Sequence, residues 1–209
     1  MAKYPEFVDL DNTTPECYQL FRFFSGHVHT RNLLYTELPA HVEKRARNDE
    51  TKAERRSIEI SLCGETTGIS EAAVELLASS ELRQGRPISY MYWDYIHVAN
   101  IDLRINSWPI SNYSMFKCLK HLAFLYIAKI KDKIIGLLEV AVIGGNAIVT
   151  FVVGNVHYWK DGVMNALFIR ALGDMAARKR FFYGTDAFIG TPIEKFTAGL
   201  GITQVLKSK

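Results

Sequence analysis

The fold of this chain is most clearly indicated by the stretch Phe151-Val-Val-Gly-Asn-Val-His-Tyr-Trp-Lys-Asp-Gly-Val-Met-Asn-Ala-Leu-Phe-Ile-Arg170. It starts with an apolar run typical of a buried strand, passes through a short loop that ends at Gly162, and continues as an amphipathic helix. The first turn of a helix leaves backbone N–H groups without intrahelical partners, and these groups bind anions, phosphates above all. The pattern therefore predicts an anion-binding bend around Gly162.

Regular elements are expected on both sides of this bend. The sequence predicts three strands before it, joined by tight turns, at residues 121–130, 134–143 and 147–153. After it we expect a helix at about 163–180, a strand at 181–188, a short helix at about 191–201 and a last strand at 202–206. The long helix carries an apolar stripe of Val163, Leu167, Ala171 and Met175. The fold class is therefore predicted as α/β of the α+β type, with a central mixed, mostly antiparallel sheet flanked by helices.

The first half of the chain gives weaker patterns. Thr14 and Pro15 start a helix that runs to about residue 24. Residues 37–56 have mixed charge with a basic excess and are either a solvated helix or a mobile arm. Further on we expect a short strand at 57–63, a helix at 69–82 capped by Ser70, and strand or irregular structure at 88–108.

The composition limits the class of protein. A chain of 209 residues with a net charge of +3 can bury one good core, and its charge permits an acidic partner without requiring one. We expect no signal peptide and no membrane span. The three cysteines, Cys17, Cys63 and Cys118, form no CxxC, so free thiols in a reducing, cytoplasmic compartment are expected. His27 and His29 have no third ligand near them in the sequence, so no metal site is expected.

Three strings carry a resemblance to a known family. Ala128-Lys-Ile-Lys-Asp-Lys-Ile-Ile-Gly136 looks like its second-to-third strand hairpin, and the stretch from Val152 to Leu167 is similar to its strand, loop and helix. Ile193-Glu-Lys-Phe-Thr-Ala-Gly-Leu-Gly201 looks like its closing helix. Together with the order of elements, these strings resemble the GNAT acyltransferase superfamily over residues 120–206.

The resemblance implies a GNAT-like fold and an N-acyltransferase that passes an acyl group from acetyl-CoA, or another acyl-CoA, directly to an amine. It implies that the backbone of Val152 and Val153 binds the pantetheine arm of the donor. The phosphates would then meet the bend, with Lys160 and the N–H groups of Gly162, Val163, Met164 and Asn165 as the binding residues. A direct transfer needs no covalent enzyme nucleophile, which fits the absence of a cysteine or serine motif in the sequence.

The loop departs from the family pattern, Gln/Arg-x-x-Gly-x-Gly/Ala, in which only Gly162 is kept. Met164 places a long side chain where the diphosphate normally approaches bare backbone, and Asp161 adds a like charge. Two alternatives therefore stay open. One is the same fold with a non-CoA activated acyl or aminoacyl donor. The other is a non-catalytic module that binds nucleic acid through the cations of the charged segment, Arg45, Arg47, Lys52, Arg55 and Arg56.

Candidate acids and bases lie near the predicted donor site. Glu139 is the first candidate base, because it interrupts an apolar central strand and burial would raise its proton affinity; a solvated hairpin face is its alternative. His157 and Tyr158 follow the third strand as a candidate acid or base, or as aromatics packing on the helix. Tyr183 and Asp186 lie at the end of the next strand, where ligands of open sheets collect. In the closing helix, Phe196 or Thr197 takes the place of the family's tyrosine acid.

The organisation expected is a single domain over residues 1–209. Residues 1–110 would shape the acceptor pocket and residues 120–206 would bind the donor. The acceptor is an amine on a small molecule, a protein or a modified nucleobase. A nucleic-acid partner and a homodimer stay open, and no membrane partner is expected.

Overall fold

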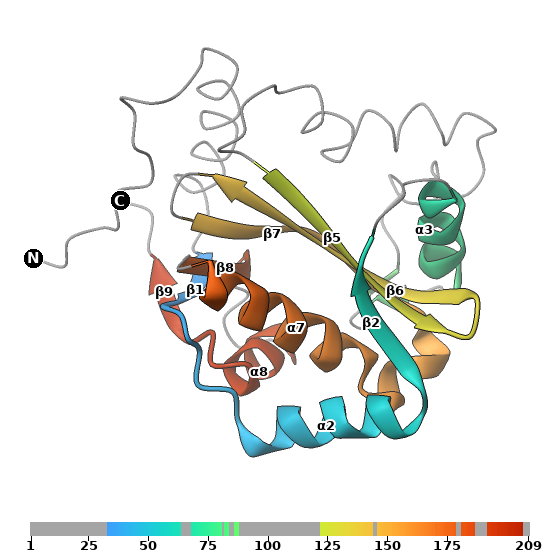
Figure 1. The fold of residues 1–209 in the computed structure, drawn as a ribbon, viewed down its shortest axis with the longest axis horizontal. Helices are drawn as coiled ribbons and strands as arrows, with labels where there is room; N and C mark the ends of the chain where they lie inside the picture. The colour runs from blue at the N-terminus through green and yellow to red at the C-terminus, as the bar shows by residue number, and fades with distance from the viewer. Residues whose placement is uncertain are drawn as a thin grey trace, which may run out of the picture.

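The computed structural model describes residues 33–63, 68–80, 82–83, 86–87, 122–143, 146–178, 181–186 and 192–206 (Figure 1). The predicted helix at 14–24, the aromatic run at 88–108, and the residues Cys17, His27, His29 and Cys118 lie outside this part of the chain.

A seven-stranded sheet forms the centre of the described molecule, in the order β2-β5-β6-β7-β8-β1-β9. Its strands are β1 (Leu33–Thr36), β2 (Ile58–Leu62), β5 (Leu122–Ile130), β6 (Lys133–Ile143), β7 (Asn146–Gly154), β8 (Phe181–Asp186) and β9 (Gln204–Leu206). All neighbours are antiparallel except β7 and β8, which are parallel. The prediction of a mixed, mostly antiparallel sheet is therefore confirmed. A separate small hairpin pairs β3 (Leu82–Arg83) with β4 (Arg86–Pro87).

Helices cover both faces of this sheet (Figure 1). On one face lie α2 (Lys44–Arg55), α7 (Val163–Ala177) and α8 (Pro192–Gly199), and on the other lies α3 (Ile69–Ala78). A short 3-10 helix, η2 (Val156–Asp161), connects β7 to α7. The order β5-β6-β7-η2-α7-β8-α8-β9 is the GNAT-like order that the resemblance implies.

Alternation along β6 produces two apolar clusters, because successive side chains of a strand point to opposite faces. Ile135, Leu138 and Val140 belong to the main core under α7 and α2, whereas Leu137 packs with α3. The stripe expected on α7 is fully buried in the main core: Val163, Leu167, Ala171 and Met175 have no exposed surface. The predicted length of this helix was too great by three residues, since Arg178 is its C-cap and lies over the ring of Phe124.

Some predictions for the first half need correction. For the charged segment, the solvated-helix alternative is confirmed and the mobile arm is wrong: α2 is a largely exposed helix that packs on the core through Ala46 and Ala53. Ser70 is not the cap of α3; that helix begins after Gly68, which adopts a left-handed conformation, and ends at Ala78. Strand β1 was not predicted, although it lies between β8 and β9.

None of the helices in the described ranges is long and apolar enough to cross a membrane.

The two-faced core gives a first prediction. Leu138→Ala should lower the free energy of unfolding by about 2–5 kcal/mol, because the side chain is fully buried and leaves a cavity. Leu62→Ala is the matched control, since Leu62 is 39% exposed on the edge strand β2 and should change stability by roughly 0.5 kcal/mol or less. Urea unfolding of both variants measures the difference. Equal losses would contradict the assignment of Leu138 to the core.

Candidate functional site

The pairing between the parallel strands β7 and β8 stops part-way along β7. The two strands are in register only at Asn146↔Phe181, Ala147↔Phe182 and Ile148↔Tyr183. Beyond Ile148, β7 continues to Gly154 and pairs with β6 alone within the described residues, while β8 pairs with β1. The second half of β7, which includes Val152 and Val153, therefore has no described strand neighbour on its β8 side.

Two side chains from the following segment close the far end of β7 at Gly154. The indole Nε1 of Trp159 donates a hydrogen bond to the carbonyl of Gly154 at 3.0 Å. The sulfur of Met164 lies so close to Gly154 that a Cβ there would be 2.4 Å from it. The predicted obstruction by Met164 is therefore located at the end of β7.

The bend itself has the geometry of a helix N-terminus. Gly162 is the N-cap of α7 with φ +81°, a left-handed conformation that favours glycine. Its own N–H donates to the carbonyl of Trp159 at 3.3 Å. Val163 is completely buried, whereas Met164 and Asn165 are partly exposed. The backbone groups expected at a helix start are thus in place.

Helix α2 packs directly on this bend. A Cβ on Gly162 would lie 2.0 Å from the main-chain oxygen of Asp49, so the α2 backbone fills the space beside the glycine. The side chain of Asn165 donates to a carboxylate oxygen of Asp49 at 2.7 Å. Asp49, which sequence reasoning did not identify, therefore contacts two residues of the bend, Gly162 through its backbone and Asn165 through its side chain. The only sequence signal was the glycine, which indicates a close approach but not which group approaches.

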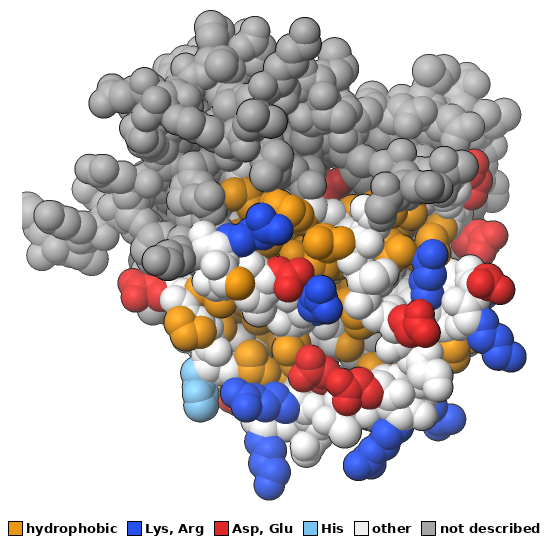
Figure 2. Space-filling view, in the orientation of Figure 1, with side chains coloured by type: hydrophobic (Ala, Val, Ile, Leu, Met, Phe, Trp, Pro, Cys, Tyr) orange, Lys and Arg blue, Asp and Glu red, His pale blue; other side chains and the backbone are white. Residues whose placement is uncertain are grey.

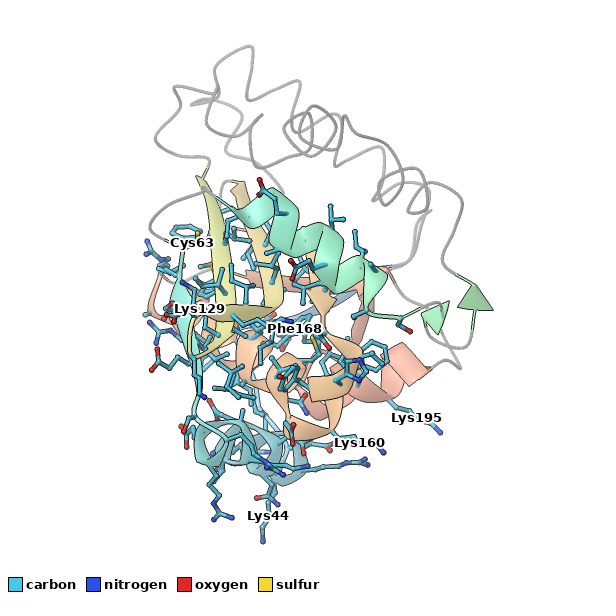
Figure 3. All side chains as sticks on the ribbon, turned by 90° about the vertical axis from the view of Figure 1, so that its right-hand side faces the viewer. Lys44, Cys63, Lys129, Lys160, Phe168 and Lys195 are labelled. Carbon is cyan, nitrogen blue, oxygen red and sulfur yellow. The ribbon has the colours of Figure 1, made fainter. Side chains whose placement is uncertain are left out.

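Cations of α2 and its C-cap bind groups of the same loop. The Lys52 ammonium donates to the carbonyl of Lys160, and the Arg56 guanidinium lies 3.5 Å from the Asp161 carboxylate. Lys160 has an exposed side chain on the same side of the molecule as Lys44 (Figure 3). The like charge expected from Asp161 is therefore partly neutralised by Arg56.

Helix α2 also brings further negative charge to this region. Glu50 follows Asp49, and burial raises the pKa of its carboxyl group; the charge of Glu54 raises it further, while Arg47 lowers it.

The five cations proposed for nucleic-acid binding, Arg45, Arg47, Lys52, Arg55 and Arg56, are exposed. Three of them have partners within the chain: Arg47 donates to the carbonyl of Val42, and Lys52 and Arg56 bind the loop. Figure 2 shows basic and acidic side chains interspersed on this face rather than a continuous basic patch.

Glu139 is buried in the middle of the sheet, with 1% of its surface exposed, so the alternative of a solvated hairpin face is wrong. It pairs with Leu125 on β5 and Phe151 on β7. These cross-strand neighbours belong to the apolar cluster under α3, which places Glu139 on the sheet face opposite α7. The carboxylate thus lies one strand away from the part of β7 where pairing with β8 has ended.

The other candidate acids and bases occupy different places. His157 is exposed on η2, and its N–H donates to the Asn155 side chain at 3.0 Å. Tyr158 is partly buried and packs against the main core.

The two candidates on β8 are described only by their backbones. Tyr183 pairs with Ile148 at the last paired position of β7 and β8, and Asp186 pairs with Leu33 on β1. Their roles remain predictions.

Residues of the closing helix pack rather than face the site. Phe196 meets Phe168 edge-on, with ring centroids 5.4 Å apart, and the Thr197 hydroxyl donates to the carbonyl of Glu194 at 3.1 Å. No group of three or more metal-binding side chains occurs among the residues that the structure describes.

Comparisons with known proteins add a distant structural likeness. No protein-family model matches the chain, and no curated protein does. Among solved structures, it is similar to the C-terminal domain of a protein provisionally assigned as a lysylphosphatidylglycerol synthetase from Agrobacterium fabrum, with a TM-score of 0.44 and 9% sequence identity. The match covers 73% of this chain and 45% of that chain, so this chain spans less than half of its length.

The packing of α2 on the bend gives a second prediction. Gly162→Ala should lower the free energy of unfolding by roughly 2–4 kcal/mol, because alanine is strained at this φ and its methyl group would collide with the Asp49 carbonyl. Gly173→Ala on the same helix is the control: it meets nothing within 4 Å and should gain about 0.5–1 kcal/mol. Thermal and urea unfolding measure both. A Gly162→Ala variant as stable as the parent would mean that α2 does not pack there.

Proposed function

We propose that this protein is a GNAT-type acyltransferase that passes an acyl group from a thioester directly to an amine. The observation that carries the proposal is the end of β7–β8 pairing at Ile148 and Tyr183. The edge of β7 from Val149 to Val153 can then bind an extended donor arm as a further strand would bind, through main-chain hydrogen bonds. The element order of residues 122–206, which follows the family's order, supports the same activity.

The proposed roles follow from position. The main chain of Val152 and Val153 binds the arm and orients the thioester at the gap between β7 and β8. Glu139, buried on the opposite face beside Phe151, receives the proton of the attacking amine directly or through water. Such a base is needed, because deprotonating a lysine-like amine at neutral pH costs about 4–5 kcal/mol.

The transfer itself is a single displacement. The amine nitrogen forms a bond to the thioester carbonyl carbon, and the carbon–sulfur bond breaks. The sulfur leaves with the electron pair of that bond. Of the two protons that the ammonium loses, one goes to Glu139 and the other to the sulfur, so the products are an amide and a free thiol. Holding the two reactants in contact supplies much of the acceleration, because it removes the entropic cost of bringing them together.

An acyl-CoA is the first donor candidate, as the resemblance implies. The contacts of α2 with Gly162 and Asn165 favour the second candidate, an activated acyl donor that is not coenzyme A. The acceptor is an amine whose carrier stays open between a small molecule, a protein and a modified nucleobase.

The proposed function gives a third prediction. Glu139→Gln should lower the rate of amide formation by roughly 10²–10⁴-fold while preserving donor binding, because it removes the base but keeps the shape of the side chain. Glu59→Gln on the exposed edge strand is the matched control and should keep full activity. Thiol release from a panel of acyl thioesters, in the presence of an amine library, measures the rate. Undiminished turnover in Glu139→Gln would remove Glu139 as the base, and no turnover of any thioester by the parent would overturn the function.

A further inference from the structure

Helix α2 packs against the bend at which the resemblance would place a donor's diphosphate. We infer that the donor site is built for an acyl thioester on a pantetheine-type arm without a diphosphate. This inference rests on the proposed acyl transfer and names its donor class.

The first argument is space. Beside Gly162, a single added methyl group would already lie 2.0 Å from the Asp49 main-chain oxygen and 2.6 Å from its carbonyl carbon. A phosphate group is larger than a methyl group, so it cannot enter on this side of the bend while α2 is in place. The N–H of Gly162 is also engaged, because it donates to Trp159.

The second argument is charge. The carboxylate that Asp49 presents to Asn165 stands at the first turn of α7, where a helix N-terminus stabilises an anion. Asp161 adds a second carboxylate just before the bend. Two nearby cations are already bound to groups of the chain: Arg56 to Asp161, and Lys52 to the Lys160 carbonyl. A diphosphate would therefore meet two carboxylates at the bend, with the exposed side chain of Lys160 to offset them but neither Lys52 nor Arg56.

The third argument is the end of the strand edge. Beyond Val153, Trp159 donates to the Gly154 carbonyl, and the Met164 sulfur covers Gly154. The edge from Val149 to Val153, which has no strand neighbour on its β8 side among the described residues, is about 17 Å long at roughly 3.3 Å per residue. An extended pantetheine-type arm can bind along this edge, but its continuation into a diphosphate would run into Met164 and Trp159.

Three ligands test the inference on the intact chain: S-acetyl-pantetheine, acetyl-CoA, and adenosine 3′,5′-bisphosphate, which has the nucleotide part without the arm. At about 100 times its Kd, a bound ligand should raise the melting temperature by roughly 5–10 °C. We expect this shift with S-acetyl-pantetheine, a smaller shift with acetyl-CoA at equal concentration, and none with the bisphosphate. Thiol release should follow the same order.

The outcomes separate the two proposals. If acetyl-CoA shifts the melting temperature more than S-acetyl-pantetheine does and the bisphosphate also binds, the inference is wrong and acyl transfer stands. If neither thioester shifts the melting temperature or releases thiol, acyl transfer itself is wrong and the inference falls with it.

A pair of variants attributes the selectivity to α2. Asp49→Asn removes the negative charge at the bend but keeps the length of the side chain, so it should narrow the difference in shift between acetyl-CoA and S-acetyl-pantetheine. Glu54→Gln removes an exposed charge from the same helix and should leave the difference unchanged. An unchanged difference in Asp49→Asn, with normal folding by circular dichroism, would overturn the role of α2.

Discussion

The backbone contact between α2 and Gly162 is the constraint on which the site depends. Helix α2 is strongly polar and buries only Ala46 and Ala53, so apolar packing alone holds it weakly. Its position is fixed by the close approach to Gly162 and by polar contacts to Asn165, Asp161 and the Lys160 carbonyl. A second left-handed glycine, Gly201, meets the backbone of His41 in the same way, since a Cβ there would lie 2.5 Å from the His41 oxygen. The two glycines therefore leave the space that lets residues 41–49 pack closely on the α7 face of the sheet.

The two parts of the candidate site, the helix N-terminus and the buried carboxylate, lie on opposite faces of the sheet. On the α7 face, the helix N-terminus that could bind an anion is covered from within the chain. On the α3 face, Glu139 is buried beside Phe151 at the level where β7 has lost its β8 partner. In the proposed acyl transfer, the chemistry would use the second face and the gap, whereas recognition of a phosphate would use the first. The two requirements can therefore change independently.

The second half of the fold could be predicted from sequence because its elements are continuous and apolar. Strands β5, β6 and β7 and the stripe of α7 have strong periodicity, and β5 and β6 are joined by the expected turn at Lys131–Lys133. Strand β1 could not be predicted, because four residues carry too little pattern to show that they lie between β8 and β9. Ser70 has the residue type of an N-cap, but the N-cap of α3 is Gly68, two residues earlier.

The site was harder to predict because one residue type serves two purposes. A glycine with positive φ at a strand–helix bend allows either a phosphate or another backbone to approach closely, and the local sequence is the same in both cases. Only the long-range position of Asp49 on α2 distinguishes them, and it depends on the tertiary packing of a polar helix. For Glu139 the sequence left burial and a solvated hairpin face both open, because one face of an antiparallel strand can be solvated, and only the position of α3 over that face decides for burial.

A covered bend is compatible with catalysis because the diphosphate is remote from the reacting atoms. Binding energy from remote groups accelerates a reaction only when it is used to position the reacting centre. In the proposed reaction, the strand edge from Val149 to Val153 would position the thioester by itself, since main-chain hydrogen bonds to an extended arm fix its direction and its position along the strand. Losing the diphosphate contacts weakens donor binding but leaves the geometry of attack intact. In the proposed reaction, selectivity against the diphosphate would come from α2, a helix that takes no part in the displacement.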